Sequence, residues 1–405
     1  MIESLKEPRA PHIFISCGEA SGDRYGAALV AALRSLLPGV RISALGGPKL
    51  ADTGVEMVAD SSDVAVMGFA EVVGALPAIL KVQRRIWQFL ASESVDMVIP
   101  IDFPGFNGKL ASQSRKLGLP VFWLIAPQVW AWGSWRTAGF RGKVNRLGTI
   151  LPFETSYFSQ RKFDVFPMGH PLMEDYGENF PFEEAMARRE HRLNDREGPL
   201  TIGVLPGSRR QELAHLLPVL KVTCQAVIGH LPDRDLRFVV SAAPGLDPVQ
   251  ISSVFDGKYE ISQEPLPELM KRLDLALVCS GTASLEAALA GVPHELVYRT
   301  GAVNAFIARR LVRTAHIGLS NLILDRRMVR EHFQDQATPL PLARNLLRWL
   351  SRPAERETFY GDVRSVRELC GESGVWRRTA QEILKLIVDK SNADATEAQA
   401  TGNGA

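Results

Sequence analysis

Two short stretches with the same layout constrain the fold of this chain more than any other feature. Residues 205–209 (LPGSR) and 279–282 (CSGT) each follow a short apolar run, and each precede a segment with the apolar spacing of a helix. A strand, a tight turn and a helix in this order are typical of a parallel α/β sheet. In such a sheet both turns lie at the carboxyl edge and face one crevice, which is where these folds bind ligands.

Both turns have the chemistry that a phosphate group needs. Their small residues expose backbone N–H groups, and each turn lies at the positive end of a helix. Arg209 adds a cation that keeps its charge and can hold two phosphate oxygens. Glu286, one helical turn after Thr282, can accept hydrogen bonds from ribose hydroxyls. Either turn alone is more often a plain strand-to-helix connection, but their combination predicts a nucleoside diphosphate site. Its predicted residues are Gly207, Ser208, Arg209, Ser280, Gly281, Thr282 and Glu286.

The first half of the chain also alternates between apolar strands and helices. The strand predicted over residues 12–17 is followed by a glycine-bearing loop, residues 18–23 (GEASGD), that lacks the GxGxxG spacing of a dinucleotide site. This loop, with Gly18, Glu19 and Ser21, can hold an anion or a substrate. It can equally be the start of a helix with Ser21 or Asp23 as its N-cap, and we give the two interpretations equal weight.

Asp102 is the candidate for acid–base chemistry. It follows a buried strand predicted over residues 97–101 and precedes Pro104 and Gly105, which stop the chain from covering it. A carboxylate at the carboxyl edge of a sheet can accept a proton from a substrate hydroxyl. An aspartate in this position can also cap its own turn, and the two interpretations are again equal.

Two stretches of the first half combine apolar and basic residues. Residues 64–90 begin with an apolar, glycine-bearing part and continue as a basic amphipathic helix, which suits a lipid substrate or a membrane interface. A core helix with a solvated basic face explains the same spacing, and spacing alone favours it. Residues 127–136 hold three tryptophans beside an arginine, which suit a wall for a sugar or acyl chain, or a plain core.

Size and composition narrow the class of protein. A chain of 405 residues, 46% hydrophobic and 23% charged, is expected to form two globular domains. Its formal net charge of +2 argues against bulk binding of nucleic acid. The four cysteines form no CxxC pair, and the sequence has no His/Asp cluster, so we expect no metal and no other cofactor. The amino-terminal residues lack the apolar core of a signal peptide, which predicts a cytoplasmic protein.

Ten motifs, taken together and in order, resemble those of one enzyme family. They are GEASGD (18–23), MGFAEV (67–72), IDFPGFN (101–107), PQVWAWG (127–133), PFE (152–154), GHPL (169–172), LPGSR (205–209), SGTASLE (280–286), YR (298–299) and SNLI (320–323). The resemblance covers roughly residues 12–385. The chain resembles the lipid-A-disaccharide synthase family of glycosyltransferases.

The resemblance implies an α/β, GT-B-like fold with two doubly wound, Rossmann-like domains and a cleft between them. Residues 1–172 would form the domain that faces the acceptor and the membrane, and residues 173–345 the UDP-sugar domain. Residues 346–390 would be C-terminal helices that pack back on the first domain, followed by a disordered tail at 391–405.

The resemblance also implies a reaction. The family transfers 2,3-diacylglucosamine from UDP-2,3-diacylglucosamine to the 6-hydroxyl of 2,3-diacylglucosamine 1-phosphate (lipid X). The transfer inverts the anomeric centre and gives the β-1,6-linked lipid A disaccharide 1-phosphate and UDP. Such an enzyme is expected at the inner-membrane surface of a Gram-negative cell and has no nucleic-acid partner. A homodimer is compatible with this expectation.

Individual residues take their roles from the matching motifs. Asp102 matches the aspartate proposed as catalytic, Arg209 the arginine of the donor diphosphate site, and Asn321 the asparagine of the cleft segment. The segment before Asn321 departs from the family pattern, because a serine-leucine-proline-asparagine run is replaced by residues 318–321 (GLSN). The residues implied to face the acceptor or its lipid chains are Gly18, Glu19, Ser21, Met67, Phe69 and Trp130.

Two rival functions use the same nucleotide site. The first is another UDP-sugar enzyme of the GT-B type, such as a MurG-like transferase or a UDP-GlcNAc 2-epimerase. The epimerase would act on a water-soluble nucleotide sugar alone, and the apolar part of residues 64–90 speaks against it. A non-catalytic protein that binds nucleotide sugars would tolerate the loss of the Asp102 carboxylate. An aspartate at an open crevice edge is an odd feature for such a scaffold.

Overall fold

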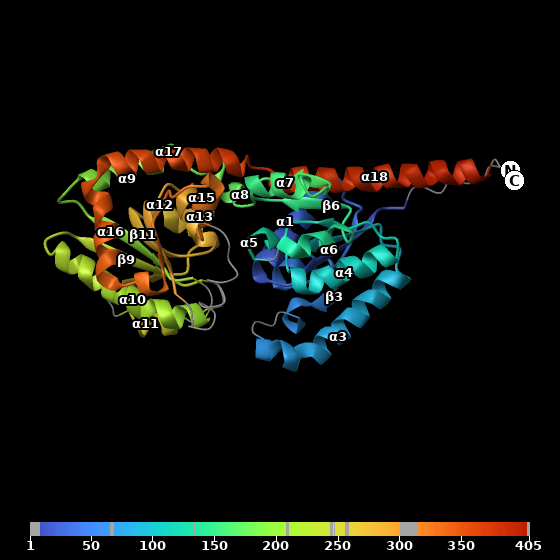
Figure 1. Cartoon of the computed structure of the whole chain (residues 1–405), viewed down its shortest axis with the longest axis horizontal. Coiled ribbons are helices and arrows are strands. Elements are labelled where there is room, and N and C mark those ends of the chain that lie inside the picture. Colours follow the sequence, from blue (N-terminus) through green and yellow to red (C-terminus); the bar gives the residue numbers. More distant parts are fainter. Residues whose placement is uncertain are drawn as a thin grey trace. The chain divides into compact units, whose positions relative to one another are not determined.

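The structure, a computed structural model of the whole chain, forms two compact units (Figure 1). It describes residues 9–402 except 65–68, 133, 208–209, 244–245, 247, 256–258 and 300–314. The first unit is Met1–Pro171 with Gly374–Ala405, and the second is Leu172–Ser373. Both are built on parallel sheets, as the alternating pattern predicts.

The first unit contains a four-stranded sheet of order β3-β2-β1-β4 and a three-stranded sheet of order β5-β6-β7. Single bridges from Val98 to Val121 and from Ile101 to Leu124 join the two sheets beside β4. The strands are β1 (His12–Cys17), β2 (Arg41–Gly46), β3 (Glu56–Asp60), β4 (Met97–Ile101), β5 (Phe122–Trp123), β6 (Arg146–Thr149) and β7 (Val165–Pro167).

Helices cover both faces of the four-stranded sheet, which explains why β1 is buried along its whole length. Ile13 and Ile15 pack in one core cluster with Leu29 of helix α1, while Phe14 packs on the other face with Ile86 of helix α3. The helices of the first unit are α1 (Ala20–Leu36), α2 (Pro48–Ala51), α3 (Phe69–Ser92), α4 (Pro104–Lys116), α5 (Val129–Trp132), α6 (Thr137–Arg141), α7 (Pro152–Ser159) and α18 (Val375–Gly402).

The second unit contains one six-stranded parallel sheet of order β10-β9-β8-β11-β12-β13. The chain starts in the middle of this sheet and winds outward in both directions, which is the doubly wound arrangement. The strands are β8 (Leu200–Leu205), β9 (Leu236–Ser241), β10 (Tyr259–Ser262), β11 (Leu275–Cys279), β12 (His294–Tyr298) and β13 (Glu331–Phe333). The helices are α8 (Met173–Tyr176), α9 (Phe182–Asn194), α10 (Arg210–His230), α11 (Pro248–Ser252), α12 (Leu266–Arg272), α13 (Thr282–Leu289), α15 (Leu319–Leu324), α16 (Pro339–Ser351) and α17 (Pro353–Cys370).

One segment of helix α10, Leu213–His230, is long and apolar enough to cross a membrane. Its inward-facing apolar side chains belong to the interior of the second unit, where Leu216, Leu220, Cys224 and Val227 are all buried. Helix α10 packs closely with helix α16. Helix α10 is therefore apolar because it packs in the core of the second unit.

Residues 346–390, expected as one group of helices that returns to the first domain, divide at Gly374 between the two units. Helices α16 and α17 belong to the second unit, and α18 belongs to the first, where it packs along α1 (Figure 1). Trp376 of α18 lies 5.4 Å from the ring of Tyr25, and Ile383 is fully buried. Helix α18 also continues to Gly402, through a tail expected to be disordered, because residues 391–401 are rich in alanine and other helix formers and contain no glycine or proline.

Residues 183–197 are rich in charged side chains and, on composition alone, would be a solvated connection between the halves. They mostly form helix α9, whose inward face carries Phe182, Ala185, Arg189 and Leu193. Arg189 is 1% exposed, and its guanidinium donates to the carbonyls of Met270, Leu273, Ala290 and Gly291. This arginine satisfies carbonyl groups where α12 and α13 end, so a charged residue serves as a core residue.

Candidate functional site

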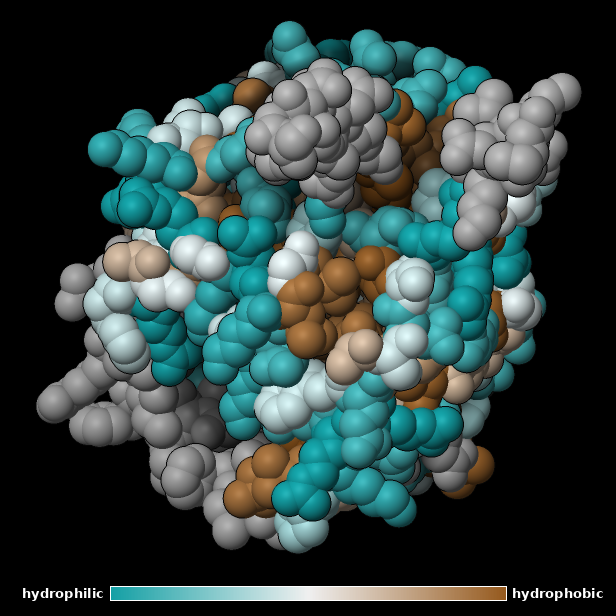
Figure 2. Space-filling model, turned by 90° about the vertical axis from the view of Figure 1, so that its right-hand side faces the viewer, coloured by the Kyte–Doolittle hydropathy of each residue, from teal (hydrophilic) through white to brown (hydrophobic). Residues whose placement is uncertain are grey.

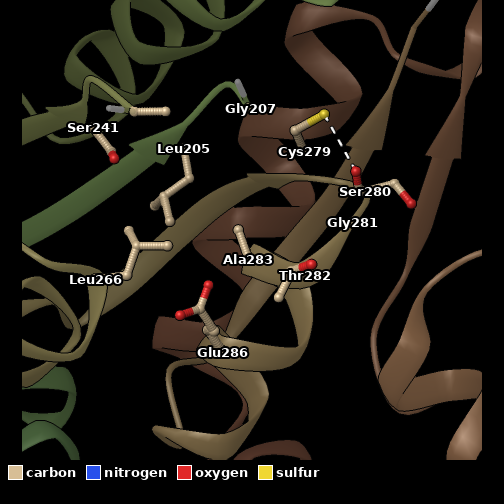
Figure 3. A pocket seen from close by; sticks show the side chains of 11 residues that line it. Leu205, Gly207, Ser241, Leu266, Cys279, Ser280, Gly281, Thr282, Ala283 and Glu286 are labelled. Atoms are coloured by element: carbon tan, nitrogen blue, oxygen red, sulfur yellow. Dashed lines mark hydrogen bonds between the residues drawn. The ribbon is translucent and has the colours of Figure 1, made fainter. Parts of the chain in front are cut away.

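The nucleotide-type pocket of the second unit lies where strands β8 and β11 end side by side. Leu205 of β8 is in register with Val278 of β11, so the turns after both strands open at one edge. A cavity of about 280 Å³ lies there, with Ser241 of β9 also on its wall (Figure 3). Its lining residues are Leu205, Gly207, Ser241, Ala243, Leu266, Cys279, Ser280, Gly281, Thr282, Ala283 and Glu286. The structure therefore brings the two predicted turns together.

The turn after β11 depends on Gly281. Its φ of 141° lies in a region that side chains other than glycine adopt only with strain. Its carbonyl accepts a hydrogen bond from Oγ of Ser284 at 2.7 Å. Helix α13 begins at Thr282 on the cavity wall, and the first N–H groups of a helix have no partner within it. The wall thus offers donors and a positive helix end to an anion.

Glu286 lies one helical turn further along α13 and lines the same cavity (Figure 3). Its side chain is buried, and the hydroxyl of Tyr176 donates to its Oε1 at 3.4 Å. The oxygens of an ionised carboxylate are the acceptors that sugar hydroxyls need. This position suits the ribose-binding role that the sequence predicts.

Two predicted residues of this pocket, Ser208 and Arg209, lie outside the described residues. Gly207, directly before them, lines the cavity and has a φ of 95°. Helix α10 begins directly after them, at Arg210.

Asn321, the remaining predicted donor residue, does not line this cavity. Its Oδ1 accepts from the backbone N–H groups of Met328 and Val329, and its Nδ2 donates to the Val329 carbonyl and to Glu331 Oε1. The amide is fully buried and fully hydrogen-bonded within the second unit. In the structure it holds α15 to the segment that leads into β13.

Asp102 stands at the carboxyl end of β4 in the first unit, in a turn with unusual backbone geometry. Asp102 has a φ of 47° and Phe103 a φ of 52°, and two consecutive left-handed residues other than glycine are rare. Burial, followed by the negative charge of Glu19, raises the pKa of Asp102 to about 6. The carboxyl group is therefore mostly ionised at neutral pH and is more basic than an ordinary aspartate.

Two neighbours, Gly18 and Asn107, hold this turn in place. A Cβ atom on Gly18 would come within 2.1 Å of the Phe103 ring, so only glycine admits the ring there. Asn107 is fully buried; its Nδ2 donates to the Asp102 carbonyl at 2.8 Å, and its Oδ1 accepts from Ser16 Oγ at 2.6 Å. Sequence reasoning missed Asn107, although the motif IDFPGFN contains it.

Glu154 is a second carboxyl group that the sequence did not single out. It is 1% exposed, and its Oε1 accepts a hydrogen bond from Nε1 of Trp130 at 3.0 Å. Burial chiefly, with a smaller contribution from the charge of Asp102, raises the pKa of Glu154 to about 7. The bond to Trp130 fixes that tryptophan, one of the predicted acceptor-facing residues, against the start of α7.

The loop at residues 18–23 does not follow the capping interpretation. Helix α1 begins at Ala20 with Glu19 as N-cap and without a side-chain capping bond. The Asp23 carboxylate instead accepts from the N–H groups of Gly47, Lys49 and Leu50, and thus caps helix α2. Glu19 and Ser21 are exposed, so their side chains are accessible to a ligand.

The remaining predicted acceptor-facing residues are only partly visible. Met67 lies outside the described residues, and of Phe69 only the backbone, at the start of α3, is described. Among the residues that are described, no group of three or more His, Cys, Asp or Glu side chains could hold a metal ion.

Comparison with known proteins places the chain among carbohydrate-active enzymes. The family model described as lipid-A-disaccharide synthetase matches residues 13–383. A lipid-A-disaccharide synthase of Syntrophus aciditrophicus (strain SB) is 35% identical over 93% of the chain and 97% of that protein. One from Myxococcus xanthus (strain DK1622) is 34% identical over 93% of the chain and 98% of that protein.

Solved structures with the same fold are more distant in sequence. The calicheamicin glycosyltransferase CalG4 has a TM-score of 0.58 at 16% identity, over 95% of this chain and 99% of that one. A UDP-GlcNAc 2-epimerase from Neisseria meningitidis, bound to UDP-GlcNAc, has a TM-score of 0.58 at 12% identity, over 92% and 100%. At this identity the likeness concerns the fold, which is the GT-B architecture of two Rossmann-like units.

Proposed function

The chain belongs to the lipid-A-disaccharide synthase family, and from this premise we propose the substrates and the residues of its reaction. It is a glycosyltransferase of lipid A biosynthesis. We propose that it transfers 2,3-diacylglucosamine from UDP-2,3-diacylglucosamine to the 6-hydroxyl of 2,3-diacylglucosamine 1-phosphate. The products are the β-1,6-linked disaccharide 1-phosphate and UDP.

The donor nucleotide binds in the pocket of the second unit. Its diphosphate lies against the helix end at Thr282 and the turn at Gly207, with Arg209 as the cation, and its ribose bonds to Glu286. UDP gains negative charge as the glycosidic bond breaks, and donors that are already in place stabilise that charge without reorganisation. This assignment gives the leaving group its stabilisation from protein groups alone, so the proposed reaction is independent of metal ions.

Asp102 acts as the general base toward the acceptor. Inversion requires the 6-hydroxyl to attack the anomeric carbon from the face opposite UDP, and a base must take the hydroxyl proton as the bond forms. One observation carries this assignment. The half-buried Asp102 carboxylate lies at the carboxyl end of β4, in a turn with two consecutive left-handed residues. Its raised pKa makes it a better proton acceptor while it stays mostly ionised at neutral pH.

The lipid chains of the substrates call for an apolar or membrane-facing surface, and helix α3 offers one. It buries Val82 and Ile86 in the core of the first unit, while Leu76 and Leu80 are 45% and 41% exposed. The exposed Lys81, Arg84 and Arg85 interleave with its buried positions. Exposed leucines beside cations suit a membrane with anionic lipids.

The end of the first unit that Figure 2 shows also carries a compact hydrophobic patch within a mainly hydrophilic surface. We therefore propose that the enzyme works on the cytoplasmic face of the inner membrane through its first unit.

Two measurements test this proposal. Purified protein incubated with the two acylated substrates should form the disaccharide, and an NMR coupling constant of the new linkage should report the β anomer. Turnover should be unchanged after dialysis against EDTA. An α-linked product would refute inversion, and loss of turnover that Mg²⁺ restores would refute metal independence.

A further inference from the structure

A second cavity in the second unit, of about 590 Å³, shares no lining residue with the nucleotide-type pocket. It lies beside β13, between the loop that leads into this strand and the start of helix α16. Most of its wall is polar or cationic. The lining residues are Ala315, His316, Asn321, Arg327, Arg330, Glu331, His332, Gln336, Thr338 and Pro341.

Arg330 is the residue that most needs a ligand. Its Nη1 is buried and has no hydrogen-bond partner. A desolvated charged donor without a partner is costly, and proteins normally pair such groups. Arg327, beside it on the cavity wall, is exposed and has no acidic partner among the described residues.

The carboxylates near these arginines already accept hydrogen bonds from, or form ion pairs with, other groups of the protein. Glu331 accepts hydrogen bonds from the N–H groups of Ile317 and Gly318 and from Nδ2 of Asn321. Arg327 and Arg330 also line a neighbouring cavity of about 490 Å³. In that cavity Asp362 pairs with Arg326 and Glu355 pairs with Arg348, at 2.5 and 2.8 Å.

Two more residues of the wall are His332 and Thr338. Nε2 of His332 donates to the buried Glu295 at 2.8 Å, so the N–H of the imidazole is used within the protein. Helix α16, thirteen residues long, begins at the wall, and the side chain of its N-cap Thr338 makes no capping bond. The first and third residues of this helix are Pro339 and Pro341, which have no N–H, so the Thr338 hydroxyl is the donor that this end of the wall adds to the two arginines.

We propose that this cavity binds a phosphate group, at a site separate from that of the donor nucleotide. Two guanidinium groups and a hydroxyl on one cavity wall match a tetrahedral dianion with several acceptor oxygens. A single carboxylate would leave most of these donors unused. The ligand is inorganic phosphate or a phosphate monoester of a small molecule, two sources with the same recognition chemistry.

The proposal is tested by calorimetric titration of the full-length protein with inorganic phosphate, in the presence of enough UDP to saturate the nucleotide-type pocket. Arg330→Gln should weaken phosphate binding by about tenfold or more, since hydrogen bonds to a charged group are lost. Arg327→Gln should weaken it to a smaller degree. If Arg330→Gln does not fold, the exposed Arg327→Gln provides the test, and wild-type melting temperature should rise with phosphate concentration.

Arg237→Gln is the matched control, because Arg237 is an exposed arginine on β9 of the same unit whose loss changes the net charge equally. It should bind phosphate as the wild type does. Tighter binding of glucosamine 1-phosphate than of inorganic phosphate would identify a monoester as the ligand, and equal binding would identify free phosphate. The proposal is overturned if phosphate does not bind, if UDP displaces it, or if Arg237→Gln weakens it as much as Arg330→Gln.

Discussion

Substitution of Asn107 by alanine tests whether the turn that presents Asp102 is held from behind. Asn107 makes two short buried hydrogen bonds, with Ser16 Oγ at 2.6 Å and with the Asp102 carbonyl at 2.8 Å. Asn107→Ala leaves both partners unsatisfied in the interior, at a cost of about 1–3 kcal/mol for each group. We expect the free energy of unfolding to fall by about 2–4 kcal/mol in urea titration, allowing for partial relaxation.

The same variant should lose activity for a local reason. Without the amide, the left-handed backbone of Asp102 and Phe103 can relax toward ordinary geometry, and the carboxylate moves. We expect kcat to fall at least tenfold while UDP affinity stays within twofold, because the nucleotide-type pocket belongs to the other unit. Ser16→Ala removes only one of the two short bonds, so its stability and kcat should lie between those of the wild type and Asn107→Ala. Wild-type stability and turnover in Asn107→Ala would refute this reasoning.

Three further predictions concern single residues. Because a base must be deprotonated, kcat/KM should fall as the pH drops through about 6, the raised pKa of Asp102. Glu19→Gln removes a negative charge that raises this pKa, so it should shift the acid side of the pH profile to lower pH. An unchanged pH profile in Glu19→Gln would contradict the assignment of Asp102 as the base. Gly281→Ala should weaken UDP binding and destabilise the turn by about 1–3 kcal/mol, because its φ of 141° strains any other residue; isothermal titration that finds unchanged affinity would count against the turn as phosphate site. Arg189→Met should lower the melting temperature and the unfolding free energy by about 3 kcal/mol or more, because it abandons four carbonyl partners; a wild-type denaturation curve would show that helix α9 is not anchored this way.

The parts of the fold that followed from the sequence are those that buried parallel strands dictate. Strand β11 and the turn at Gly281 were predictable, because an apolar run followed by small residues and helix formers has one common solution in an α/β sheet. The meeting of this turn with the one after β8 followed from topology alone. Strand β13 is only three residues long and left no periodicity to detect.

What the sequence concealed were polar residues whose partners lie far away along the chain. Arg189 looked like part of a solvated charged segment, because its four carbonyl acceptors lie 81 to 102 positions further on. Glu154 and Asn107 stood in recognised motifs, but their hydrogen bonds to Trp130 and Ser16 depend on packing that no spacing rule encodes. Asn321 is the opposite case, because it was predicted as a ligand-binding residue but its amide is hydrogen-bonded to the backbone of the protein itself.

The central claim is that Asp102 takes the proton from the acceptor hydroxyl during glycosyl transfer. The most direct test measures disaccharide formation from UDP-2,3-diacylglucosamine and 2,3-diacylglucosamine 1-phosphate by wild type and Asp102→Asn, with UDP affinity measured in parallel. Asp164→Asn, an exposed aspartate of the same unit, is the control. We expect Asp102→Asn to keep wild-type UDP affinity while turnover falls about a hundredfold or more. Turnover close to that of the wild type in Asp102→Asn would show that Asp102 is not the base.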